Sequence, residues 1–163
     1  MSTFDPTPFM FREPEGDDEW AATMEELQAP FMLGWIINTS PPITTHVERG
    51  MVKVRMPVDP STGGGAGSSG GMHGGIIGAL LDMAGTLAAF SQMRQGQVGR
   101  GTMNLEISYL RPAAGEWVEA TATVKKPGAT VSTVYIDIHT DAGKLVASGR
   151  VLYAIGDKEK SKL

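Results

Sequence analysis

The chain has 163 residues, of which 41% are hydrophobic and 20% are charged, the balance expected of one globular domain with a substantial core. Its formal net charge of −4 argues against non-specific binding to nucleic acid. It contains no cysteine, which excludes disulfides, thiol nucleophiles and cysteine metal ligands, and its three histidines show no metal-ligand spacing. We therefore expect no metal, no separate cofactor and no nucleic-acid partner.

The N-terminal segment, residues 1–30, predicts an arm followed by a short helix. The helix is expected to open at Asp17, where acidic residues suit the positive end of a helix, and to end before Pro30. No basic region precedes an apolar run, so no secretory signal is expected. No apolar run is long enough to predict a membrane span, so we expect no membrane partner.

A single domain is predicted for residues 31–156. Residues 31–39 form an apolar run that predicts the first strand. Residues 43–56 predict further strand structure with a turn near Gly50. Residues 57–71 are rich in proline, serine and glycine and predict a loop.

The stretch from Gly70 to Phe90 predicts one long buried helix, because apolar residues recur at helical spacing between Ile76 and Ala88. The opposite face carries small residues rather than polar ones, so we expect other structure to wrap the helix. Its glycines lower helix propensity, which predicts a close approach of a neighbour or a ligand. The one charge in its middle, Asp82, is costly there unless it is paired or functional.

The C-terminal half predicts β structure. Residues 92–101 predict a polar linker, and four segments with strand patterning follow at 102–109, 117–125, 130–140 and 144–155. Short turns between them predict an antiparallel meander. One helix wrapped by a curved antiparallel sheet is an α+β domain.

The start of the helix predicts a binding site for a polarised carbonyl. His73 is followed by Gly74 and Gly75, whose N–H groups are expected to be free and unobstructed at the positive end of the helix. Asp82 comes eight residues after Gly74, about 12 Å along the helix axis. One helix cannot bring both groups to one atom, whereas two antiparallel helices about a two-fold axis can. The spacing predicts at least a homodimer.

His73-Gly74-Gly75 with Asp82, followed by the segment from Gly101 to Pro112, resembles the hotdog-fold acyl-CoA thioesterases of the PaaI-like type. The resemblance runs from about Leu33 to Tyr153. It implies the hotdog fold and the hydrolysis of acyl-CoA to free acid and CoA. CoA would be part of the substrate rather than a cofactor, and the assembly would be a homodimer or homotetramer.

The resemblance also implies catalytic roles. Asp82 would be the nucleophile or the general base, acting across a dimer interface, and the Gly74 N–H would polarise the thioester carbonyl. Thr102 would place a hydroxyl near the carboxylate or the attacking water, and His73 would orient groups near the carbonyl. Each also has an alternative without a catalytic role. Thr102 would be an ordinary strand residue, and His73 would form a hydrogen bond with the backbone at the start of the helix.

Two further residues are assigned to substrate binding. Gly75 offers a second backbone N–H. Thr86 follows Asp82 by four residues, shares its helix face, and could hold the carboxylate or a water; ordinary helix packing is the alternative. Arg100, Arg111 and the pair Lys125-Lys126 could contact CoA phosphates or form a solvated surface.

The sequence departs from the family pattern at Gly67, where relatives often carry asparagine or glutamine six residues before the histidine. This departure favours an alternative from another class, a non-catalytic acyl-CoA-binding hotdog module. A hydratase or dehydratase ranks last, because those relatives use histidine with aspartate or glutamate at different positions.

Residues 157–163 predict a charged tail that ends in Ser161, Lys162 and Leu163. Ser-Lys-Leu at a free carboxyl end is the peroxisomal import signal. It predicts an import receptor as partner and a peroxisomal or glycosome-like location. In a bacterium the tripeptide would be a coincidence, and a cytoplasmic location is the alternative.

Overall fold

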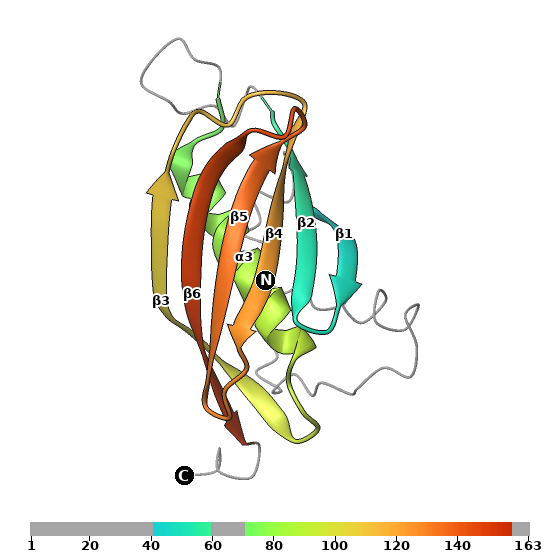
Figure 1. Ribbon diagram of the computed structural model, residues 1–163, viewed down its shortest axis with the longest axis vertical. Helices are drawn as coiled ribbons and strands as arrows, with labels where there is room; N and C mark the ends of the chain where they lie inside the picture. The colour runs from blue at the N-terminus through green and yellow to red at the C-terminus, as the bar shows by residue number, and fades with distance from the viewer. Residues whose placement is uncertain (1–40, 60–70, 158–163) are drawn as a thin grey trace, which may run out of the picture.

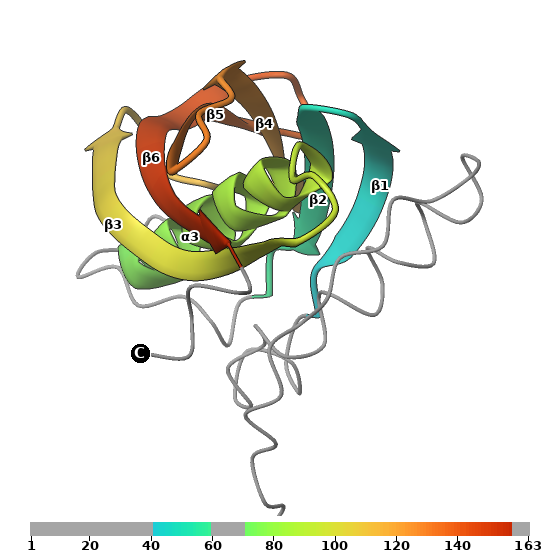
Figure 2. The same cartoon turned by 90° about the horizontal axis from the view of Figure 1, so that it is seen from below.

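The computed structural model describes residues 41–59 and 71–157. In these residues a curved six-stranded antiparallel sheet wraps around one helix (Figures 1 and 2). The elements are β1 (Ile43–Glu48), β2 (Met51–Pro57), α3 (Gly74–Ser91), β3 (Gln97–Tyr109), β4 (Trp117–Lys126), β5 (Val131–Thr140) and β6 (Leu145–Asp157). The predicted α+β class, with a central helix in a curved antiparallel sheet, is confirmed.

Several predictions lie outside the described residues. These are the arm and helix of residues 1–30, the strand of residues 31–39, Gly67, and the terminal Ser161, Lys162 and Leu163. The import signal and the domain limits at residues 31 and 156 therefore stay predictions.

The strand order is β1-β2-β4-β5-β6-β3, and every neighbouring pair is antiparallel. The hairpins β4-β5 and β5-β6 follow the predicted meander. The meander is wrong for β3, which pairs with β6 and not with β4. The connection over residues 110–116 crosses the end of the sheet to reach β4 (Figure 1), and the Leu110 N–H donates to the Val146 carbonyl there at 2.9 Å.

The predicted linker of residues 92–101 is wrong over its second half, because β3 begins at Gln97. Val98 is buried and pairs with Gly156 of β6. Three glycines in this stretch interrupt the side-chain alternation that signals a strand. The backbone pairing, rather than the side-chain pattern, defines β3 here.

The core lies between α3 and the concave face of the sheet (Figure 2). Inward-facing positions alternate with outward ones along β2, β4 and β5. The buried strand residues are Val52, Val54, Met56, Val118, Ala120, Ala122, Val134, Ile136 and Ile138, and the helix contributes Ile76, Ile77, Leu80, Leu81, Ala84, Leu87 and Ala88. The apolar helix face predicted from the sequence is confirmed.

By length and composition α3 could also cross a membrane, which the sequence reading did not anticipate for any segment. However, 72% of its length is buried. An apolar composition of this kind is also expected of a helix that a sheet encloses.

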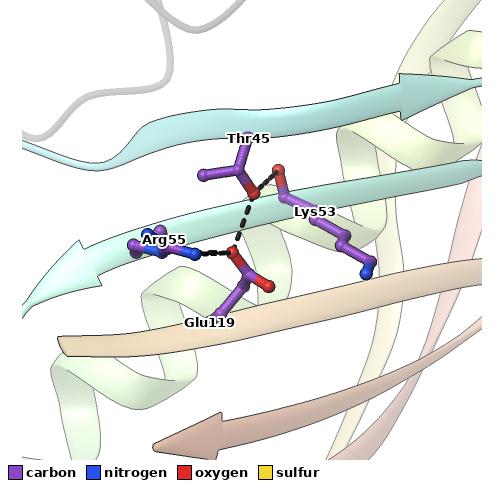
Figure 3. Close-up of polar contacts among 4 residues, drawn as sticks. All are labelled: Thr45, Lys53, Arg55 and Glu119. Atoms are coloured by element: carbon purple, nitrogen blue, oxygen red, sulfur yellow. Dashed lines mark hydrogen bonds and ion pairs between the residues drawn. The ribbon is translucent and has the colours of Figure 1, made fainter. Parts of the chain in front are cut away.

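The outer face of the sheet carries a polar cluster that joins the edge strand β1 to β2 and β4 (Figure 3). Glu119 Oε2 accepts hydrogen bonds from Thr45 Oγ1 at 2.8 Å and from Arg55 Nε at 3.2 Å. The Arg55 guanidinium also lies 3.9 Å from the ring centroid of Trp117. Because these polar groups satisfy one another's hydrogen-bonding capacity, we infer that the cluster anchors β1 to the rest of the sheet.

The glycine at position 85 allows the close approach that the sequence predicted. A methyl group at Gly85 would lie 2.8 Å from Val151 Cγ2 and 3.3 Å from Ile136 Cδ1. Both neighbours are buried and cannot retreat. α3 therefore packs directly on β5 and β6 at this point.

We expect Gly85→Ala to lower the free energy of unfolding. Alanine improves helix propensity by about 1 kcal/mol, but overpacking a rigid core costs about 1–3 kcal/mol. Urea unfolding measures the net change. The control is Gly78→Ala, where the added methyl group meets the flexible end of Ile107 at 3.2 Å. A Gly85→Ala variant as stable as the Gly78→Ala control would contradict this packing.

Candidate active site

The start of α3 is capped by His73. Its backbone is extended (φ −62°, ψ 137°), and its Nδ1 accepts a hydrogen bond from the Gly75 N–H at 2.9 Å. A neutral imidazole that accepts at Nδ1 carries its proton on Nε2. The expectation of a free amide at Gly75 is therefore wrong, because the histidine next to it takes that donor. His73 itself is exposed.

The N–H of Gly74 forms no hydrogen bond among the described residues. Its carbonyl accepts a hydrogen bond from the Tyr109 hydroxyl at 3.0 Å. The tyrosine comes from the end of β3 and lies across the first turn of α3. The arrangement leaves one donor available at the positive end of an 18-residue helix.

Asp82 lies in the middle of α3, is half-buried, and faces β3. Thr102 Oγ1 donates a hydrogen bond to its Oδ1 at 2.7 Å. The pairing of β3 with β6 shifts register on both sides of this threonine, between Gly99 and Gly101 and between Thr102 and Asn104. Such bulges re-aim side chains, often next to functional sites. The contact leaves the other carboxylate oxygen without a partner among the described residues.

Thr86 is buried, with 3% of its surface exposed. The described hydrogen bonds do not join it to Asp82, whose partner is Thr102 on another element. The structure thus brings Asp82 together with Thr102, and Gly74 together with His73 and Gly75, but leaves Thr86 in the core.

Two tyrosines to which the sequence analysis assigned no site role lie near these groups. Tyr109 meets Gly74, as described. Tyr153 on β6 is buried; its burial and, to a smaller extent, the negative charge of Asp82 raise its pKa to about 12, while a hydrogen bond with the Gly101 backbone lowers it. The strand alternation could have placed Tyr153 on the inner face, but nothing in the sequence indicates its proximity to Asp82.

A groove of about 390 Å³ opens beside Gly74 at the end of the sheet. Its walls are mostly apolar, and they consist of Gly71, Met72, Gly74, Ile77, Tyr109, Leu110, Arg111, Pro112, Ala113 and Val146. Of the four basic residues considered for CoA phosphates, only Arg111 lines this groove. Lys125 and Lys126 end β4 at the opposite end of the sheet.

Among residues 41–59 and 71–157, the strand that carries Thr102 is an edge of the sheet, with β6 on one side only. It is 13 residues long and exposes apolar side chains, with Met103 63% and Tyr109 56% exposed. Leu105 and Leu110 add to this surface. A long apolar edge strand is a template for pairing with another chain.

These groups suit acyl transfer better than metal chemistry. A helix-terminal N–H can stabilise the oxyanion that forms when a carbonyl is attacked, and a carboxylate held by a hydroxyl can act as nucleophile or base. Within residues 41–59 and 71–157, no group of three histidine, aspartate or glutamate side chains could hold a metal ion. Asp82 and Gly74 remain about 12 Å apart along one helix.

Comparisons with known proteins agree with this chemistry. A family model described as the thioesterase superfamily matches residues 69–147. The medium/long-chain acyl-CoA thioesterase YigI of Escherichia coli is 29% identical over 97 residues, which cover 52% of this chain and 63% of that protein. The chain thus spans less than two thirds of that relative.

Two proteins from Haemophilus influenzae add to the comparison. One, provisionally named an esterase, is 30% identical over 104 residues, covering 64% of this chain and 72% of its own. The crystal structure of a thioesterase superposes with a TM-score of 0.72 at 23% identity, covering 86% of this chain and 94% of that one. The structural likeness confirms the predicted hotdog fold.

Proposed function

The chain belongs to the thioesterase superfamily, and we propose that it hydrolyses acyl-CoA thioesters to a free acid and CoA. The observation that carries the proposal is the 2.7 Å hydrogen bond from Thr102 Oγ1 to the carboxylate of Asp82. A half-buried carboxylate in an otherwise apolar helix is costly, and a hydroxyl from another element holds it in one orientation. The Escherichia coli relative named above makes medium- and long-chain acyl-CoA the first substrates to test.

In the proposed reaction, the thioester carbonyl accepts a hydrogen bond from the Gly74 N–H, and the helix dipole stabilises the oxyanion that develops. Asp82 either attacks the carbonyl carbon directly or removes a proton from the attacking water. The carbon–sulfur bond breaks, and CoA leaves as the thiolate and takes up a proton. Thr102 holds the carboxylate through the hydrogen bond at Oδ1.

The two routes differ in the intermediate. Direct attack forms an anhydride between Asp82 and the acyl group, which water then hydrolyses. After a single turnover in water labelled with oxygen-18, label in Asp82 would show direct attack, because attack of water on the aspartyl carbonyl of this anhydride leaves it there. The general-base route, and attack of water on the acyl carbonyl of the anhydride, place the label in the free acid alone.

We further propose that the active site is shared by two subunits. Asp82 and Gly74 of one helix are too far apart to act on one carbonyl, whereas an antiparallel copy of the helix brings the partner's glycine to this aspartate. Pairing of β3 with its copy would place the two helices in this way and would cover the exposed apolar edge. The minimum active unit is then a homodimer, with a dimer of dimers as the larger form.

We expect Leu105→Lys to dissociate the dimer and to abolish activity along with it. Leu105 lies in the middle of β3 and is already 36% exposed in the single chain, so the fold should tolerate the change. A lysine on an edge strand opposes pairing, and we expect the dissociation constant to rise about tenfold or more. Sedimentation velocity and activity measured over the same concentrations test this.

The control is Tyr135→Lys, which places the same charge on the outer face, where this side chain is also exposed. It should leave the dimer intact, although it would disrupt a tetramer built through that face. An active monomer at micromolar concentration, in either variant or in wild type, would contradict the shared site.

The test of the function itself is a hydrolysis screen over short-chain, long-chain and aryl acyl-CoA with wild type and Asp82→Asn. Release of free thiol by wild type alone is the expected result. The alternative of a non-catalytic acyl-CoA-binding module predicts binding without turnover, with affinity unchanged in Asp82→Ala. No thiol release across the whole panel would reject the proposed hydrolase.

A further inference from the structure

The side chain of Tyr153 has no part in the reaction described above, yet it lies next to the groups that carry it. It is 4% exposed, and its ring meets Phe90 edge-on with the centroids 5.4 Å apart. Thr102 is its cross-strand partner in the pairing of β3 with β6. Opposed residues of antiparallel strands project to the same face, so both side chains lie on the helix side of the sheet.

The β3 backbone before Thr102 rests on this aromatic pair. A Cβ atom at Gly99 would lie 2.7 Å from Tyr153 Oη and 2.5 Å from Phe90 Cε1, which only glycine avoids. Gly101 has φ +118°, a conformation that other residues rarely adopt. The bulge between these glycines is therefore shaped by the two rings beneath it.

The Tyr153 hydroxyl has two polar neighbours. One is the backbone of Gly101, which lowers the pKa of the phenol, and the other is the carboxylate of Asp82, whose negative charge raises it. The hydroxyl oxygen also lies 2.7 Å from the position that a Cβ atom of Gly99 would take, so it rests directly on the β3 backbone that forms the bulge. The hydroxyl thus connects the bulge to the immediate surroundings of Asp82.

We infer that Tyr153 is a positioning residue for the Asp82–Thr102 pair: its hydroxyl fixes the β3 bulge at Gly101, and the bulge aims the Thr102 hydroxyl at the Asp82 carboxylate. The inference rests on the proposed thioesterase function. It assigns Tyr153 no contact with the substrate.

The test is Tyr153→Phe in the full chain, which keeps the ring and its contact with Phe90 and removes only the hydroxyl. We expect kcat to fall about tenfold with KM unchanged, because a misaimed catalytic group slows the chemical step. If Tyr153 acts through Thr102, then Thr102→Val should cost far less in the Tyr153→Phe background than in wild type. Tyr135→Phe, on the outer face, is the matched control and should change nothing.

A second measurement does not depend on activity. Amide hydrogen exchange of Gly101 should speed up in Tyr153→Phe and stay unchanged in Tyr135→Phe, because the hydroxyl that rests on the backbone of the bulge is lost. Unchanged exchange at Gly101, or additive losses for Tyr153→Phe and Thr102→Val, would overturn the inference. If the protein hydrolyses no acyl-CoA but the exchange at Gly101 still speeds up in Tyr153→Phe, the proposed function is wrong and the role of Tyr153 in positioning the bulge stands.

Discussion

Replacing Asp82 by asparagine is expected to lower kcat/KM for acyl-CoA by at least about 100-fold, the range associated with loss of a catalytic acid–base group. The amide is nearly isosteric with the carboxylate and can still accept the hydrogen bond that Thr102 donates at 2.7 Å. It is neither a nucleophile nor a base. The fold and the helix should therefore survive while the chemistry is lost, as measured by thiol release and by the unfolding midpoint.

Asp137→Asn is the matched control. Like Asp82, Asp137 accepts a hydrogen bond from a hydroxyl group on a strand, here from Ser148 at 2.6 Å. It lies on the outer face of the sheet, away from the proposed site. It should retain wild-type activity. Full activity of the Asp82 variant would show that the carboxylate in α3 is structural and would remove the basis of the mechanism.

Gly74→Pro is expected to reduce kcat by about 100- to 1,000-fold, as the removal of an oxyanion-stabilising donor does. Position 74 is the first residue of α3, where proline is well tolerated because the N–H has no partner within the helix. The preceding His73 already has ψ 137°, which is the conformation that a following proline requires. The substitution thus removes one N–H with little other change.

Gly74→Ala separates loss of the donor from added bulk. A Cβ atom there meets the Tyr109 ring at 3.5 Å, which is ordinary contact, and the N–H is kept. Activity close to wild type is expected for alanine and a large loss for proline. Equal losses in the two variants would mean that space beside Tyr109, and not the N–H, is what the reaction needs.

Much of the fold could be predicted from the sequence because its patterns are strong. The apolar positions of α3 recur at helical spacing, and Val134, Ile136 and Ile138 alternate with exposed residues along β5. The turn at Gly50 follows from its φ of +86°, which glycine supplies at no steric cost. Each of these patterns lies within one short segment, so it predicts the secondary structure of that segment without knowledge of the rest of the fold.

The placement of β3 could not be predicted in this way. Strand order depends on which backbones pair across the whole sheet, and β3 joins β6 because the crossing connection carries β4 to the other side. Its glycine-rich beginning also lacks the side-chain alternation of a strand. The edge position that exposes Thr102 and Leu105 is therefore a property of the tertiary structure.

The site was predictable in part. Asp82 stood out as a charge within an apolar helix, and the sequence resemblance supplied Thr102 as its neighbour. The hydrogen bond from the Gly75 N–H to His73 Nδ1 depends on the rotamer of the histidine, which residue spacing does not determine. Tyr109 and Tyr153 reach the site across strands, so their roles appear only when β3, β6 and α3 are assembled.

The claim that two subunits share each active site is tested most directly by mixing two inactive variants. A heterodimer of Gly74→Pro and Asp82→Asn contains one site with an intact glycine from one subunit and an intact aspartate from the other. After exchange of subunits at equal amounts, random pairing should restore about a quarter of wild-type activity. If both groups acted within one subunit, every site would lack one of them, and the mixture would stay as inactive as its components.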